Sequence, residues 1–119
     1  MFDEVLNRMG ASVPGSRGIM IVGIDGIPVE QWVAGPDVNL DLVATEFTNL
    51  LKGSRRNSRD TGLGDLQQII ILAENGILII GDITPDYFLL FLLDPAGNLG
   101  KARFELRKAK IVLEPELTL

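Results

Sequence analysis

Two stretches of the chain are apolar at every position, where a half-exposed strand would be apolar at alternate positions. They are GIMIVGI at residues 18–24 and YFLLFLL at residues 87–93. Strand-like runs are joined by short links at Asp25-Gly26, typical of a type I′ turn, at Asn75-Gly76 and at Thr84-Pro85-Asp86, and links this short connect antiparallel strands. An antiparallel sheet with one face in water alternates apolar and polar residues. Both faces are therefore expected to be covered, which predicts an α+β fold of three layers, α/β/α, around an antiparallel sheet.

The spacing of apolar residues predicts one pass of helix, two strands, helix, three strands and helix. The expected ranges are 2–10, 18–24, 27–33, 37–51, 66–73, 77–83, 87–93 and 98–115. Gly10 is expected to end the first helix, and either Asp37 or Asn39 to cap the second. A polar, glycine-rich loop over 52–65 follows, with or without an extra helical turn at its start. Pro115 is expected to end the last helix, so that the chain forms one domain over residues 1–119.

Three helices cannot cover both faces of a five-stranded sheet. Five strands span about 24 Å, and a helix with its side chains is about 10–12 Å across. Two helices cover one face, and the third covers about half of the other. We expect a second copy of the chain to cover the rest, against a partly apolar stripe on the second helix. The stripe consists of Val38, Leu42, Thr45 and Asn49. The alternative is a monomer in which long side chains and a loop fill the gap.

The composition disfavours an enzyme. The 119 residues include neither Cys nor His, which removes thiol nucleophiles, imidazole ligands and the usual general base. The carboxylates are scattered, without the spacing of a calcium loop. Gly18 and Gly23 have the spacing of a phosphate-binding loop, but Ile24 and Asp25 stand where it needs Lys and Ser or Thr. Asp82 and Asp86 flank a tight corner and are interpreted as turn formers more readily than as an acid–base pair. No cofactor or metal is expected.

Basic residues lie in two islands on an acidic chain of net charge −5, over residues 52–59 and 101–110. This balance disfavours nucleic acid, because binding to phosphates depends on many cations. The islands fit a protein partner, or else they complement helix dipoles and are solvated. Three arginines of the first island are candidates for an inserted arginine finger, for partner contact, or for solvated charge: Arg55, Arg56 and Arg59.

Trp32 is a further candidate, either as a contact anchor or as a cap on the sheet edge.

No membrane insertion is expected, because the apolar run Tyr87–Leu93 is far too short to span a bilayer. The acidic N-terminus is unlike a signal peptide, so we expect a cytoplasmic protein. A module of this size can also hold a pocket, and a small-ligand sensor would show a vacancy near Phe88 to Leu92.

The order of elements resembles the roadblock/dynein light chain family, in particular its small bacterial and archaeal members. The residues that carry the resemblance are IVGIDGIPVE, LVATEFTNLLK and DPAGNLGKARFELRKA, in this order over nearly the whole chain. The chain is also similar to a regulator of gliding motility that acts on a Ras-like GTPase, although it is shorter at both ends.

The resemblance implies a roadblock/profilin-like sheet of order 2-1-5-4-3, with one helix on one face and two on the other. It implies a homodimer whose second helices pack antiparallel and whose third strands adjoin through Ile69 and Ile71. The implied function is a non-catalytic scaffold that binds a small Ras-like GTPase and modulates its nucleotide cycle, with activation in trans as one form of this. The alternative is a light-chain-type adaptor that tethers a larger protein without nucleotide dependence.

Overall fold

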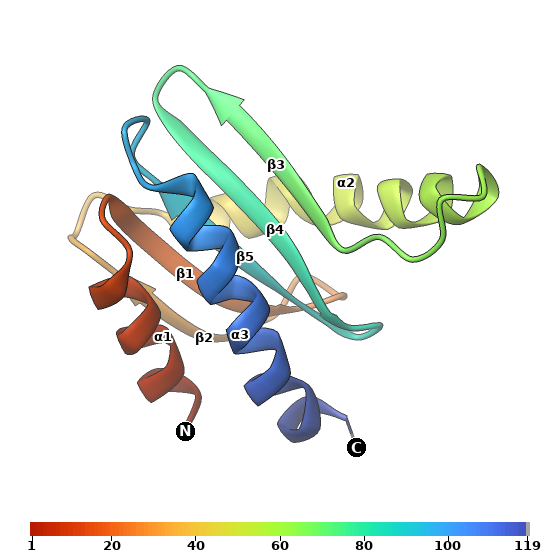
Figure 1. Cartoon of the computed structure of the whole chain (residues 1–119), viewed down its shortest axis with the longest axis horizontal. Coiled ribbons are helices and arrows are strands. Elements are labelled where there is room, and N and C mark those ends of the chain that lie inside the picture. The colour runs from red at the N-terminus through yellow and green to blue at the C-terminus, as the bar shows by residue number, and fades with distance from the viewer. Residues whose placement is uncertain (119) are drawn as a thin grey trace.

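The sheet has the order β2-β1-β5-β4-β3, with every neighbouring pair antiparallel. This computed structural model describes residues 1–118 (Figure 1). The elements are α1 (Phe2–Ser12), β1 (Ser16–Gly23), β2 (Pro28–Val33), α2 (Leu40–Asp60), β3 (Gln68–Ala73), β4 (Gly76–Thr84), β5 (Tyr87–Leu93) and α3 (Leu99–Leu117). The predicted sheet order and the predicted sequence of elements are confirmed.

Helices cover both faces of the sheet, as the uninterrupted apolar strands predict. We call the side on which α2 packs the α2 face, and the side on which α1 and α3 pack the α3 face. In β1, Ile19 belongs to the core of the α3 face and Met20 to the core of the α2 face, and neither is exposed. Their partners across the ladder to β5, Phe91 and Leu90, are also fully buried. Alternate residues of one strand thus enter two different cores.

Helix α2 is longer than predicted: it includes residues 52–60 of the expected loop, more than the one extra helical turn allowed at its start. The helix runs on to Asp60, and Thr61 is its C-cap. Gly53 and the polar residues after it carry little apolar pattern, but the helix is fixed at this end by the buried side chain of Arg55. In Figure 1 this end of α2 extends past β3.

Two predicted helix ends were also wrong. Gly10 lies inside α1, where a Cβ would come within 2.6 Å of the indole ring of Trp32. The glycine therefore serves a close approach between helix and strand. Pro115 lies inside the last turns of α3, which continues to Leu117. The carbonyl that loses its partner there belongs to Ile111, which is 74% exposed, so water can satisfy it.

The first hairpin is confirmed, but its turn is not type I′. Asp25 does not have a positive φ, whereas Gly26 has a φ of 89°. The N–H of Gly26 donates to the carbonyl of Gly23 at 2.8 Å, and the N–H of Gly23 donates to Ile27 at 2.9 Å. This is the three-residue loop in which a β-turn is followed by a left-handed glycine. The carboxylate of Asp25 accepts from the N–H of Ile27 at 3.0 Å, which stabilises the turn without a left-handed aspartate.

Two helices begin at asparagines, and the first of these is one of the two caps expected for the second helix. Asn39 caps α2 by accepting from the N–H of Leu42 at 3.1 Å, and Asn98 caps α3 by accepting from Lys101 at 3.0 Å. None of the helices over residues 1–118 combines the length and the apolar character that a membrane crossing would require.

Candidate functional site

The outward side of α2 carries most of the predicted interface stripe. Leu42 is 57% exposed, and Thr45 and Asn49 are exposed beside it at helical spacing. Val38 differs from the expectation, because it precedes the N-cap and packs half-buried against the core of the α2 face. A further large apolar side chain, Leu50, is 44% exposed on the same helix. This side of α2 therefore presents apolar and small polar groups, together with the carboxylate of Glu46, to its surroundings.

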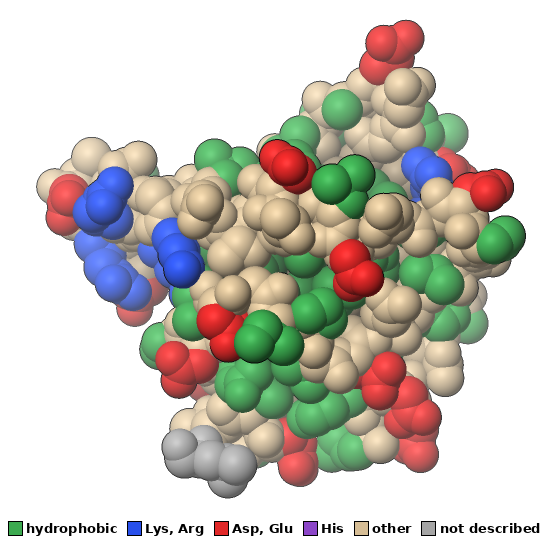
Figure 2. Space-filling view, turned by 180° about the vertical axis from the view of Figure 1, so that it is seen from behind, with side chains coloured by type: hydrophobic (Ala, Val, Ile, Leu, Met, Phe, Trp, Pro, Cys, Tyr) green, Lys and Arg blue, Asp and Glu red, His purple; other side chains and the backbone are tan. Residues whose placement is uncertain are grey.

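The sheet beside α2 is incompletely covered. An open apolar hollow of about 390 Å³ lies between Val43 and Phe47 of α2 and the strands near Ile71 and Leu92. Hydrophobic side chains gather on this face around α2 in Figure 2. One helix therefore leaves part of the α2 face of the sheet uncovered, as the count of three helices predicts.

The edge strand β3 borders this hollow. Ile69 and Ile71 are half-buried and pack against the core of the α2 face. Leu72, which points to the opposite face, is 70% exposed. Within residues 1–118, β3 is hydrogen-bonded to β4 alone, so its outer edge is unpaired. An unpaired apolar edge is a ready site for strand pairing.

The vacancy expected near Phe88 to Leu92 is present only at one end of that stretch. Leu92 borders the apolar hollow, whereas Phe88, Leu90 and Phe91 are fully buried in the two cores.

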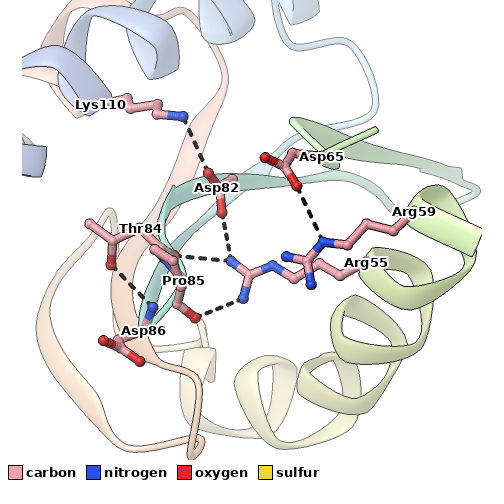
Figure 3. Close-up of polar contacts among 8 residues, drawn as sticks. All are labelled: Arg55, Arg59, Asp65, Asp82, Thr84, Pro85, Asp86 and Lys110. Carbon is pink, nitrogen blue, oxygen red and sulfur yellow. Dashed lines mark hydrogen bonds and ion pairs between the residues drawn. The ribbon is translucent and has the colours of Figure 1, made fainter. Parts of the chain in front are cut away.

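Arg55 is a structural residue with its side chain only 11% exposed (Figure 3). Its guanidinium donates to the carboxylate of Asp82 at 2.7 Å, to the carbonyl of Thr84 at 3.2 Å and to that of Pro85 at 3.0 Å. The second carboxylate oxygen of Asp82 accepts from Lys110 of α3 at 3.2 Å. Asp82 thus joins the helices of both faces at the end of β4, and Arg55 is not available as a free cation.

The other two predicted arginines remain on the surface. Arg59 is exposed and forms an ion pair with Asp65 at 3.2 Å, as Figure 3 shows. Arg56 is exposed, and none of the ion pairs within residues 1–118 includes it. Together with Lys52 these residues form a basic end of the α2 surface, where Lys and Arg side chains gather in Figure 2. All of them belong to α2, not to a loop.

Trp32 lies half-buried against the core of the α3 face, with its ring over Gly10 of α1. This position corresponds to a cap on the β2 edge, the second of the two interpretations of this residue. Within the described residues 1–118, no group of three or more acidic side chains is arranged to hold a metal ion.

Sequence reasoning missed Asp82 and the carbonyls of the β4–β5 turn as partners of Arg55. The contact joins residues 27 positions apart, and the three arginines look alike in the sequence. A buried arginine next to a carboxylate at a strand end is visible only once the fold brings α2 against β4.

Comparison with known proteins settles the family. The model of the Roadblock/LC7 domain matches residues 1–94. The chain belongs to the Roadblock/LC7 family. A relative from Methanocaldococcus jannaschii, the uncharacterized protein MJ0714, is 30% identical over 109 residues, which cover 92% of this chain and 90% of that protein.

Two solved structures of bacterial proteins share this Roadblock/LC7 fold. MglC from Myxococcus xanthus is 27% identical, with a TM-score of 0.70 over 98% of each chain. MglB, solved in a tetrameric arrangement, has a TM-score of 0.86 at 20% identity, over 95% of this chain and 85% of that one. At this lower identity MglB shows likeness of fold. The family and these neighbours are consistent with a regulatory adaptor.

Proposed function

We propose that this Roadblock/LC7 protein is a homodimeric scaffold that binds a small Ras-like GTPase in the cytoplasm and modulates its nucleotide cycle. The observation that carries the proposal is the uncovered α2 face, with Leu42 exposed on the helix and Ile71 at the border of an apolar hollow. Monomeric proteins rarely leave such a surface beside an unpaired strand edge, because both favour association. A second copy, with α2 antiparallel to α2 and β3 beside β3, covers both features at once.

The two-fold arrangement suits the shape of α2. Its C-terminal end extends past β3 in Figure 1, so in a dimer paired through β3 it lies over the sheet of the partner. Two of the exposed groups in the middle of the helix, Thr45 and Asn49, are small, and the longer Glu46 is exposed beside them. The same surface then repeats on both subunits, as an isologous interface requires.

The GTPase part of the proposal is supported by the likeness to MglB and MglC and by the basic end of α2. Lys52, Arg56 and Arg59 are exposed there, and such a group steers an acidic partner surface toward the dimer. Arg55 is occupied by Asp82, so an arginine that acts in trans on a bound nucleotide would be Arg56 or Arg59. The chain itself supplies no further catalytic group in this proposal.

The test is capture of purified Ras-like GTPases from the same genome, loaded with GDP or with a non-hydrolysable GTP analogue, followed by hydrolysis rates. We expect recovery in one nucleotide state and a clear loss with Arg56→Glu. The matched control is Arg8→Glu, since Arg8 is an exposed arginine on α1. Equal recovery in both states would refute the regulatory role and favour the light-chain-type adaptor.

A small-ligand sensor remains a second candidate because of the hollow of about 390 Å³. It predicts that a ligand and the second subunit compete for Phe47 and Leu92. A dimer whose dissociation constant does not change with any added metabolite extract would count against it.

A further inference from the structure

A second, polar hollow lies at the start of β3. It measures about 460 Å³ and is lined by Arg103 and Arg107 of α3 together with Ser58 and residues 65–68. The Nε of Arg103 donates to the side-chain oxygen of Gln68 at 3.1 Å, which holds its guanidinium beside the first residue of the strand. Arg107 lies one helical turn further along α3 and is exposed.

The charges in this hollow are unbalanced. Neither Arg103 nor Arg107 forms an ion pair within the part of the chain that the structure describes, residues 1–118. The one carboxylate of the lining, Asp65, is already paired with Arg59 at 3.2 Å. The hollow therefore presents two guanidinium groups that an anion would satisfy.

An exposed carboxylate lies at the opposite end of the same strand. Glu74 follows Ala73 in the link between β3 and β4, and no ion pair within residues 1–118 includes it. Gln68 contacts α3 and Ile70 packs into the core of the α3 face, whereas Glu74 lies in the turn beyond the strand and also lines the rim of the apolar hollow. The exposed carboxylate of Glu74 thus lies at the tip of the β3–β4 hairpin, where it is not confined to one face of the sheet.

Pairing of β3 with its own copy brings these two ends together. In an antiparallel pair related by a two-fold axis, one residue opposes itself, and the midpoint of Gln68–Ala73 falls between Ile70 and Ile71. If Ile71 is at the axis, Glu74 opposes Gln68 of the partner subunit. If Ile70 is at the axis, Glu74 opposes Leu66 of the partner subunit. Both positions line the polar hollow.

We propose that the carboxylate of Glu74 of each subunit lies in the Arg103–Arg107 hollow of the partner subunit, twice per dimer. With Ile71 at the axis the carboxylate pairs with Arg103. With Ile70 at the axis it pairs with Arg107, which lies one turn further along α3. A slip of two further residues moves the carboxylate by about 7 Å, out of reach of both arginines. This inference rests on the proposed homodimer and adds a charge pairing that fixes how its two sheets meet.

Crosslinking tests the contact directly, because the chain has no native cysteine. A variant with Glu74→Cys and Arg107→Cys is expected to form a disulfide-linked dimer under mild oxidation. Within one subunit, Glu74 follows the end of β3 and Arg107 of α3 lies beside the start of β3. The two positions are about 20 Å apart, a distance that no disulfide spans. The controls are each single substitution and the pair Glu74→Cys with Arg8→Cys. A second pair, Glu74→Cys with Arg103→Cys, tests the other arginine. If the unmodified chain is a dimer and neither pair forms a crosslink, the proposal is overturned.

Charge reversal gives a second, independent measurement. Glu74→Lys is expected to raise the dimer dissociation constant about tenfold, because two symmetry-related pairs are lost and like charges meet. Adding Arg103→Glu or Arg107→Glu in the same chain is expected to restore most of the affinity. A monomeric parent chain would refute the homodimer itself. A dimeric parent whose dissociation constant is unchanged in every variant would refute only the charge pairing.

Discussion

Replacement of Arg55 by alanine tests whether this residue holds α2 to the sheet. The substitution removes three hydrogen bonds from a side chain that is 11% exposed. It leaves the carbonyls of Thr84 and Pro85 without this donor. Asp82 keeps its ion pair with Lys110 at 3.2 Å, and its side chain is 23% exposed. Its charge is therefore neither fully buried nor unpaired in the variant.

The expected loss follows from these contacts. Removal of one partner from a fully buried ion pair costs about 3–5 kcal/mol. The remaining bond to Lys110 and the partial exposure of Asp82 reduce this, and we expect a loss of about 2–3 kcal/mol in the free energy of unfolding. For a domain of this size that corresponds to a fall of about 10 °C in the melting temperature.

The assay is urea unfolding followed by circular dichroism, at one protein concentration for all variants because dimerisation adds to apparent stability. Arg56→Ala is the matched control, since the neighbouring Arg56 is exposed and its loss should cost less than about 0.5 kcal/mol. Arg55→Lys keeps the charge without the planar fork, so we expect it to recover less than half of the loss. If Arg55→Ala unfolds like Arg56→Ala, the reasoning about this anchor is wrong.

Four further substitutions have definite expected outcomes. Leu42→Asp should leave the fold intact, because the side chain is 57% exposed, and should halve the particle mass in light scattering, whereas an unchanged mass would exclude this face as the interface. Gly10→Ala should destabilise by about 1–3 kcal/mol and shift the emission of Trp32, since the new Cβ would lie 2.6 Å from the ring. Gly53→Ala, in open space on a helix, should instead stabilise by about 0.5–1 kcal/mol in thermal unfolding. Asn39→Ala should cost about 1 kcal/mol in the same assay through loss of the cap on Leu42.

The layers of the fold could be predicted because the central strands are buried on both faces. Such strands leave an unbroken apolar run in the sequence, and short links between them require antiparallel pairing. The runs at β1 and β5 lie side by side in the middle of the sheet, with Met20 opposite Leu90. The strand order itself came from the resemblance to the family, since no local pattern encodes which strands are neighbours.

The interaction surface could be predicted only in part. Leu42, Thr45 and Asn49 lie on one side of α2 because helical spacing is a local property. The separate roles of Arg55, Arg56 and Arg59 were beyond sequence reasoning, because burial of the first depends on Asp82 from a strand 27 residues away. The end of α2 was missed for the same reason, as residues 52–60 have little apolar pattern and are fixed at a distance.

Helix α2 has two sides with different tasks, and this separates stability from assembly. Its inner side places Leu40, Ala44 and Leu51 in the core and is fixed at its far end by Arg55. Its outer side, with Leu42, makes few contacts within the subunit. A change on the outer side should therefore alter association alone. A change at Arg55 should alter both, because Asp82 also holds Lys110 of α3, and α3 carries the arginines proposed to receive Glu74 of the partner subunit. Comparison of the unfolding free energy with the dimer dissociation constant across the two kinds of variant distinguishes a surface that only binds from a helix that also supports the fold.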